Sequence, residues 1–238
     1  MLLKKYFRFM SNIAIIPARS GSKRIPLKNI KSFLGKPIIS YSINAALKSK
    51  LFDEIIVSTD NDEIAEIAIK YGAKVPFFRS KKNSNDFAST FDVLEEVLKK
   101  YDNGEKDYKY GCCIYPAAPL VCENLIIKGY EKIIVNSWDT IFPVVEFLHP
   151  IERALYFNNQ KKINFLSPKN NVKRTQDLKK YFHDSGQFYW FNIKKLLTNK
   201  CLISKNTSGF IVSSNEIQDI DNIDDWKLAE LKYKLKYK

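Results

Sequence analysis

The sequence predicts an α/β protein in which helices flank a mostly parallel sheet, and three observations support this prediction. Short apolar runs alternate with segments of helical spacing through the first half of the chain, as they do in βαβ units. Strand-like runs return after a polar stretch at residues 147–180. The chain has 238 residues, of which 45% are hydrophobic, and this is enough for the core of one domain with an insertion.

Each expected strand is a short apolar run, and each expected helix has apolar residues at helical spacing. The expected strands cover residues 12–17, 54–58, 74–78, 111–115, 187–191 and 209–212. The expected helices cover residues 38–47, 62–71, 89–100 and 223–237. Asp221 or Asn222 can cap the last helix, and Asp224 and Asp225 suit its positive N-terminal end. Ligands of open parallel sheets bind outside the carboxyl ends of the strands, so the loops after residues 17, 58, 78 and 115 are expected around one crevice.

The domain organisation is expected to be an extension at residues 1–11 and one domain at residues 12–238. Residues 147–180 are rich in Asn and Lys and weakly periodic, and we interpret them as an insertion because further strands follow. The first ten residues are basic and aromatic without a sustained apolar run, so a signal peptide is not expected, and Met10 is an alternative start. No run approaches the ~20 apolar residues that a membrane-spanning helix needs.

Cysteine spacing and net charge exclude some functions and favour others. The four cysteines form no Cys-x-x-Cys pair and lie apart from the two histidines, so a zinc site is not expected. Cys112 and Cys113 adjoin an apolar run, which suggests reduced thiols and a cytoplasmic protein. The net charge of +13 favours phosphate-bearing partners, although the lysines are scattered. A nucleic-acid-binding protein is the alternative from another class, but no RNA-recognition or helix-turn-helix signature is present.

The loop after the first expected strand combines basic, hydroxyl and glycine residues. Its members are Arg19, Ser20, Gly21, Ser22, Lys23, Arg24 and Lys28. Backbone N–H groups of a turn, together with Lys and Arg, form a concave site for anions. The spacing fits neither a Walker A loop nor the dinucleotide-binding motif. From the residues alone, this segment is either a phosphate site or a solvated basic loop.

Two carboxylates, Asp219 and Asp221, precede the last expected helix. Alternate residues of an extended chain share a face, so both carboxylates are expected on one side while Ile220 faces the core. Mg²⁺ binds a few carboxylates together with water and substrate phosphates. The pair is therefore a candidate Mg²⁺ site, while Asp is also a favoured residue before a helix.

A third polar segment spans residues 174–189 and contains several groups that can recognise a substrate. The guanidinium of Arg174 can bind a carboxylate through two hydrogen bonds. His183 can position a substrate or act as a base, or it can be a core residue beside Phe182. Asp184 can orient His183. The residues alone leave these roles open.

These segments resemble those of a known enzyme family. Residues 16–29 resemble the N-terminal signature of the acylneuraminate cytidylyltransferases, the CMP-sialic acid synthetases, and residues 33–38 resemble the stretch before the first helix of sugar nucleotidyltransferases. The resemblance extends over residues 12–230. It implies a Rossmann-like nucleotide-diphospho-sugar transferase fold, CTP as the nucleotide and Mg²⁺ as the cofactor. The implied reaction transfers CMP to the anomeric hydroxyl of a nonulosonic acid and releases pyrophosphate.

The resemblance also implies roles for individual residues. The implied catalytic residues are Arg19, Lys28, Asp219 and Asp221, of which Asp219 and Asp221 are the metal ligands. The implied nucleotide-binding residues are Arg19, Ser20, Gly21, Lys23, Lys28, Asn29, Arg79, Ala88 and Thr90. The implied sugar-binding residues are Arg174, Gln176, His183, Asp184 and Gln187. Fixed cations beside the leaving pyrophosphate lower the barrier of a single in-line displacement.

Substrate choice rests on two segments. Residues 174–178 and 183–186 resemble the subgroup that makes CMP-pseudaminic acid, so pseudaminic acid is the expected sugar; sialic acid, legionaminic acid and 3-deoxy-octulosonate are the alternatives. Four residues stand where sialic-acid enzymes usually carry polar side chains, and this more apolar wall suits a sugar with fewer hydroxyls. They are Tyr115, Ala117, Ala118 and Val121. The resemblance implies a homodimer formed through residues 147–180, and no nucleic-acid or membrane partner is expected.

Overall fold

The computed structural model describes residues 11–101 and 107–237. The strands of the central sheet are β1 (Ser11–Pro17), β4 (Glu54–Ser58), β5 (Tyr108–Ile114), β6 (Thr140–Glu146), β9 (Phe182–Asp184), β10 (Phe188–Asn192) and β11 (Thr207–Ile211). Two short hairpins lie outside this sheet: β2 (Ser32–Phe33) with β3 (Lys36–Pro37), and β7 (Leu155–Phe157) with β8 (Ile163–Phe165). The expectations for residues 1–10 lie outside the described residues.

The central sheet has the order β11-β6-β10-β5-β1-β4, with β9 beside β6. The pairs β4–β1, β1–β5 and β11–β6 are parallel. Strand β10 is antiparallel to both of its neighbours, and β9 is antiparallel to β6. The expected α/β class with a mostly parallel sheet is therefore confirmed, and the antiparallel strands are those that border the polar stretch at residues 147–180.

The helices are α2 (Ile39–Ser49), α3 (Asp62–Lys70), α4 (Thr90–Lys100), α5 (Glu123–Asn136), α6 (Ile193–Asn199) and α7 (Ile223–Lys236). Short 3₁₀ turns cover Lys81–Asn83, Ile151–Arg153, Pro168–Asn170, Thr175–Asp177 and Ser214–Glu216. Reciprocal side-chain and backbone hydrogen bonds begin two of the helices: Ser89 with Asp92 at α4, and Asn222 with Asp225 at α7. Such capping boxes satisfy N–H groups that a helix start leaves free, and they assign the cap of α7 to Asn222.

The alternation of side chains along β1 builds a core on both faces of the sheet. Ala14 and Ile16 belong to a cluster that includes residues of α2, α3 and α5. Ile13 and Ile15 belong to a second cluster that includes residues of α4 and α6. All four side chains are at most 1% exposed. This two-sided burial explains why the run reads as continuously apolar.

A third apolar cluster packs residues 25–38 against the last helix, α7, and the segment before it. It contains Ile25, Phe33, Ile38, Ile220, Trp226 and Ala229. These residues come from the loop after β1, the β2–β3 hairpin, the residue before α2, and α7 with the segment before it. The cluster therefore fixes the segment before α7 against the loop after β1.

The structure differs from the sequence expectations in several elements. The expected strand at residues 74–78 is wrong: Lys74 forms an isolated bridge with Ile56, and Pro76 lacks the N–H that a longer ladder would need. Strand β1 begins at Ser11, inside the expected extension. Strands β6 and β9 and helices α5 and α6 were not anticipated.

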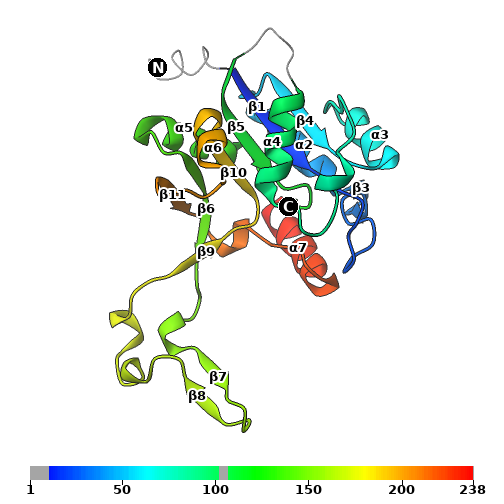
Figure 1. Ribbon diagram of the computed structural model, residues 1–238. Coiled ribbons are helices and arrows are strands. Elements are labelled where there is room, and N and C mark those ends of the chain that lie inside the picture. Colours follow the sequence, from blue (N-terminus) through cyan, green and yellow to red (C-terminus); the bar gives the residue numbers. More distant parts are fainter. Residues whose placement is uncertain (1–10, 102–106, 238) are drawn as a thin grey trace.

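Residues 147–180, which we call the arm, extend from the end of β6 to the residues before β9 and carry the β7–β8 hairpin. Figure 1 shows the arm projecting away from the body that holds the central sheet. Much of its apolar surface is uncovered, including Leu155, Phe157 and Val172, which are 54%, 71% and 91% exposed. Across the parts of the chain that the structure describes, no helix is long and apolar enough to cross a membrane.

Candidate active site

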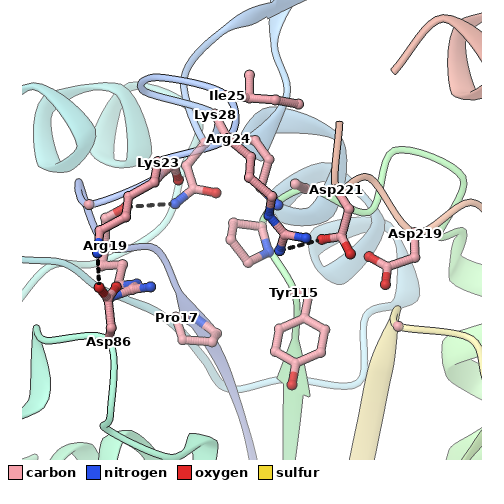
Figure 2. Close-up of a pocket in the computed structure, with 16 residues that line it drawn as sticks. Pro17, Arg19, Lys23, Arg24, Ile25, Lys28, Asp86, Tyr115, Asp219 and Asp221 are labelled. Atoms are coloured by element: carbon pink, nitrogen blue, oxygen red, sulfur yellow. Dashed lines mark hydrogen bonds and ion pairs between the residues drawn. The ribbon is translucent and has the colours of Figure 1, made fainter. Parts of the chain in front are cut away.

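A cavity of about 500 Å³ lies at the carboxyl ends of β1 and β5. It is lined by Pro17, Arg19, Gly21, Ser22, Lys23, Arg24, Ile25, Lys28, Asn29, Asp86, Tyr115, Pro116, Ala117, Gly186, Asp219 and Asp221. Figure 2 shows Arg19, Lys23 and Asp86 on one side of the cavity, and Asp219 and Asp221 on the other. Open parallel sheets bind their ligands at this edge.

Backbone hydrogen bonds bring the loops after β1 and β4 together. The N–H of Ala18, just after β1, donates to the carbonyl of Ser58 at 2.9 Å, and the N–H of Arg79 donates to the carbonyl of Thr59 at 2.7 Å. The N–H and hydroxyl of Ser20 both donate to the carboxylate of Asp60, at 2.8 and 3.1 Å. The loops after residues 17, 58 and 78 therefore meet, as expected, but the loop after residue 58 does not line the cavity, and the one after residue 78 reaches it only through Asp86. The hydroxyl of Ser20 is used in holding the loop after β1 to Asp60.

Four cations from the loop after β1 line the cavity: Arg19, Lys23, Arg24 and Lys28. The side chain of Asn29 donates to the carbonyl of Arg19 at 2.9 Å and is 5% exposed as a residue, so it joins the two ends of the loop. Ile25 is buried in the third apolar cluster. These two anchors hold the intervening basic residues at the cavity instead of in open solvent.

Asp86 faces the first two of these cations. Its carboxylate lies 2.7 Å from Arg19 and 2.5 Å from Lys23. Hydrogen bonds lower the pKa of Asp86, and the one from Lys23 contributes more than the one from Arg19. Asp86 also lines a second cavity of about 570 Å³ between the loop after β1 and residues 84–87. A carboxylate of the protein itself therefore pairs with two cations of the basic loop.

The acid pair before α7 faces the remaining two cations. Arg24 lies 2.7 Å from Asp221, and the ammonium of Lys28 donates to the carbonyl of Ile220 at 2.8 Å. Burial lowers the pKa of Lys28, and Asp221 and Asp219 oppose that shift. Burial, together with the charge of Asp221, raises the pKa of Asp219. As predicted, both aspartates face the cavity while Ile220 is 1% exposed in the core.

The acid pair fits a Mg²⁺ site in which a substrate supplies the remaining ligands. Two carboxylates of like charge share one cavity, and burial, followed by the charge of Asp221, raises the pKa of Asp219. Within residues 11–101 and 107–237, no group of three or more His, Cys, Asp or Glu side chains forms a metal site. Mg²⁺ is commonly held by one or two carboxylates plus substrate phosphates, so a two-carboxylate site beside a basic loop suits it.

Three expected nucleotide-binding residues, Arg79, Ala88 and Thr90, do not line the cavity. Arg79 is 7% exposed, and its guanidinium donates to the hydroxyl and the carbonyl of Ser58 at 3.0 and 2.5 Å. Burial lowers the pKa of Arg79 to about 10, although Asp60 and Glu96 raise it, so the side chain stays charged at neutral pH. The hydroxyl of Thr90 lies 3.1 Å from the phenol of Tyr115. Ala88 lies half-buried just before α4.

The five expected sugar-binding residues do not line the cavity of the described chain. Arg174 pairs with Asp177 on the arm at 3.0 Å, and Gln176 is exposed there. The ring of His183 packs edge-on against Phe147. Asp184 is exposed, and its carboxylate accepts the N–H of Gly186 at 2.8 Å, whereas Gln187 is buried and only 1% exposed.

Several cavity residues were not among the predicted site residues. They are Pro17, Ser22, Arg24, Ile25, Asp86, Tyr115, Pro116, Ala117 and Gly186. Ser22 and Arg24 belong to the basic loop, and Tyr115 and Ala117 to the apolar wall, that the sequence indicated without giving these residues individual roles. The other two wall residues, Ala118 and Val121, are 2% and 4% exposed in the core. Nothing in the local sequence signals Asp86, because its partners lie more than 60 positions earlier in the chain.

Comparisons with known proteins agree with this geometry. Residues 13–197 match the sequence model of a family described as Cytidylyltransferase. Pseudaminic acid cytidylyltransferase of Campylobacter jejuni is 42% identical over 96% of this chain and 98% of its own length. CMP-N,N'-diacetyllegionaminic acid synthase of Legionella pneumophila is 30% identical over 93% of this chain and 95% of its own length.

Solved structures share the fold. The structure of a CMP:2-keto-3-deoxy-manno-octonic acid synthetase complexed with CTP superposes with a TM-score of 0.70, covering 95% of this chain and 99% of that one at 18% identity. A 4-diphosphocytidyl-2C-methyl-D-erythritol synthase from Anaerococcus prevotii gives a TM-score of 0.61 at 15% identity. At such identities, the likeness establishes the architecture alone.

Proposed function

The chain belongs to the cytidylyltransferase family, and on this premise we propose that it transfers CMP from CTP to the anomeric hydroxyl of pseudaminic acid, releasing pyrophosphate. One observation carries the proposal: four cations of the loop after β1 and the carboxylates of Asp219 and Asp221 meet in a single cavity. Nucleotidyl transfer needs this combination, because a triphosphate requires fixed cations and a divalent metal requires carboxylates.

The cations act on the leaving group. Displacement at the α-phosphorus transfers negative charge to pyrophosphate, and cations fixed before the reaction stabilise that charge without reorganising. Arg19 and Lys23 are placed to bind the outer phosphates once Asp86 releases them. Lys28, held beside the acid pair by the carbonyl of Ile220, is placed for the α-phosphate. No covalent enzyme intermediate is required, and the residues present do not identify a general base.

Asp219 and Asp221 would hold Mg²⁺, which when bound would supply a Lewis acid that orients the phosphate and sugar oxygens. The pair is itself positioned from both sides. Lys28 holds the intervening carbonyl, and the carboxylate of Asp225 accepts the N–H of Asp221 at 3.0 Å. These contacts fix the backbone that carries the two carboxylates before substrate arrives, which favours electrostatic preorganisation.

Two features support pseudaminic acid as the sugar. The Campylobacter jejuni enzyme named for that sugar is 42% identical, whereas the Legionella legionaminic acid enzyme is 30% identical. Tyr115, Pro116 and Ala117 line the cavity and offer few hydrogen-bonding groups, which suits a sugar with fewer hydroxyls. Legionaminic acid and sialic acids are the second candidates, because the legionaminic acid relative covers almost the same length of chain.

Pyrophosphate release tests the proposal. Each of the four nucleoside triphosphates is combined with Mg²⁺ and with pseudaminic, legionaminic and N-acetylneuraminic acid in turn. We expect release with CTP and pseudaminic acid. Faster turnover of N-acetylneuraminic acid would overturn the sugar assignment, and release with another nucleotide would overturn CTP.

The arm supports a homodimer. It carries the exposed apolar residues Leu155, Phe157 and Val172, and exposed apolar patches of this kind mark protein interfaces. It also carries Arg174 and Gln176, which do not line the cavity of their own chain. We infer that a second copy covers the arm and receives these two side chains at its cavity. The four cysteines are free, in keeping with the cytoplasmic location that we also propose.

Subunit mixing tests the shared site. Asp221→Asn and Arg174→Ala chains, each nearly inactive at low sugar concentration, are mixed and allowed to exchange. If the arm completes the partner's site, mixed dimers contain one intact site, and about a quarter of the unmodified activity returns, because half of the dimers are mixed. No recovery, in a mixture shown to contain mixed dimers, would place both residues in the same chain's site.

A further inference from the structure

Gly186, in the turn between β9 and β10, is the cavity residue next to Asp219. Its φ is +65°, in the left-handed region that glycine adopts without strain. A Cβ atom built on Gly186 would lie 3.3 Å from Cγ of Asp219 and 3.5 Å from its Oδ1. The missing side chain therefore does two things: it permits the backbone conformation, and it leaves room for the carboxylate of Asp219.

The neighbours of Gly186 hold the turn in place. The carboxylate of Asp184 accepts the N–H of Gly186 at 2.8 Å, an aspartate turn that stabilises the residue two positions later. The other carboxylate oxygen of Asp184 accepts the hydroxyl of Tyr189. The amide of Gln187 donates to the carbonyl of Glu216 at 2.8 Å, three residues before Asp219. Both sides of the turn are thus fixed, and one is tied to the segment that carries the acid pair.

We propose that the Asp184–Gln187 turn positions Asp219 for the metal: Asp184 fixes the left-handed conformation of Gly186, and Gly186 admits the Asp219 carboxylate beside Asp221. This inference rests on the proposed metal role of Asp219. It differs from the sequence expectation, which placed Asp184 and Gln187 on the sugar. Side chains that orient metal ligands in this way typically change metal affinity by about 10–100-fold when removed.

The test compares five substitutions. Asp184→Asn keeps the size of the side chain but leaves one acceptor for two donors. Gly186→Ala and Gly186→Asn both add a Cβ that would crowd Asp219. Asparagine tolerates the left-handed conformation, so the Asn variant separates this crowding from backbone strain. Asp224→Asn is the matched control, since Asp224 is an exposed aspartate close in sequence that pairs with Lys227. Asp219→Asn calibrates the loss of a metal ligand.

Two readouts are taken. The first is direct Mn²⁺ binding, followed by electron paramagnetic resonance in the presence of a CTP analogue with a methylene group between the α- and β-phosphorus. The second is the KM for sugar at saturating CTP and Mg²⁺. We expect Asp184→Asn and both Gly186 variants to weaken Mn²⁺ binding by about 10-fold, with the KM for sugar unchanged and the control unaffected.

Other outcomes separate the possible failures. Normal Mn²⁺ binding in Asp184→Asn with a raised KM for sugar would overturn the proposal and return Asp184 to the sugar. Normal Mn²⁺ binding in the Gly186 variants would also overturn it. Normal Mn²⁺ binding in Asp219→Asn would instead remove the metal assignment of the proposed function. If the Gly186 variants fail to fold, Tyr189→Phe, which deletes one hydrogen-bond donor to Asp184, must weaken Mn²⁺ binding by about 3-fold for the proposal to stand.

Discussion

The two sides of this active site are built in different ways. The nucleotide side lies within the body, where the loop after β1 and the segment before α7 share an apolar cluster and line one cavity. The expected sugar side is divided, since Arg174 and Gln176 lie on the exposed arm while Asp184 and Gln187 are engaged in a turn. On the proposed assignment, one chain assembles the charged centre of the reaction, while recognition of the sugar would depend on where the arm is placed.

The largest effect on activity is expected on the nucleotide side, whose residues all come from one chain. Asp221→Asn keeps the shape of the side chain but removes a charge that faces Arg24 and Lys28. We expect kcat to fall by about 100–1,000-fold, the usual cost of removing one preorganised electrostatic group. Steady-state pyrophosphate release at saturating substrates measures this, with circular dichroism as a check on folding. A variant with more than a third of the original kcat would remove Asp221 from the reaction.

A smaller and more selective effect is expected on the arm. Arg174→Ala should raise the KM for sugar by about 10–100-fold, because a charge-assisted hydrogen bond to a carboxylate contributes about 1.5–3 kcal/mol. The KM for CTP should not change. Lys173→Ala is the matched control, since it removes the neighbouring positive charge of the arm. An equal rise in both variants would mean that the arm attracts the sugar by charge alone, without a specific contact.

The same comparison explains how much the sequence could predict. Local patterns sufficed for β1 and β4, which are continuous apolar runs, and for α4, which begins with a capping box at Ser89. The alternation rule also placed Asp219 and Asp221 on one face with Ile220 in the core. These features depend on residues that are close in sequence, so a period of two or of 3.6 residues reveals them.

Features that depend on distant contacts were not readable. Lys28 reaches the carbonyl of Ile220, 192 positions away, and the amide of Gln187 reaches the carbonyl of Glu216. The direction in which a polar side chain points is decided by such tertiary partners, which no local pattern encodes. For that reason the sequence indicated charged residues that the structure gathers in one cavity, whereas Gln187, which was expected to bind the sugar, is buried in the structure.

A buried carboxylate on α4 holds the segment that leads to Asp86, and its ionisation should be visible in the stability of the protein. The side chain of Glu96 is 8% exposed and accepts hydrogen bonds from Ser80, Asn83 and Lys100, which fixes residues 80–84 on α4. Although burial raises the pKa of Glu96, these hydrogen bonds lower it from 4.5 to about 2. Because the folded pKa lies below the unfolded one, the stabilisation is complete above pH 4.5 and is lost as the pH falls toward 2.

We therefore expect Glu96→Gln to reduce the free energy of unfolding by about 2 kcal/mol at pH 7, and the difference from the unmodified protein to vanish as the pH approaches 2. Urea unfolding at several pH values measures both. Glu95→Gln is the matched control on the adjacent position, where the carboxylate pairs with Lys99 alone, and it should cost less than about 0.5 kcal/mol. A pH-independent loss in Glu96→Gln would show that packing, not ionisation, stabilises this loop.

The smallest expected effect concerns the cations of the nucleotide side in the absence of substrate. Asp86 holds Arg19 and Lys23 at 2.7 and 2.5 Å, so triphosphate must compete with a carboxylate that is already present. Asp86→Asn removes that competitor while keeping its size, and the pairs are partly exposed, so their strength is modest. We expect the KM for CTP to fall by about 3-fold with kcat unchanged, and the gain to shrink as added salt screens the charges. A rise in the KM for CTP would mean the opposite, namely that Asp86 holds the two cations in position for the phosphates, and the nucleotide side would then be preorganised by its acids as well as by its apolar anchors.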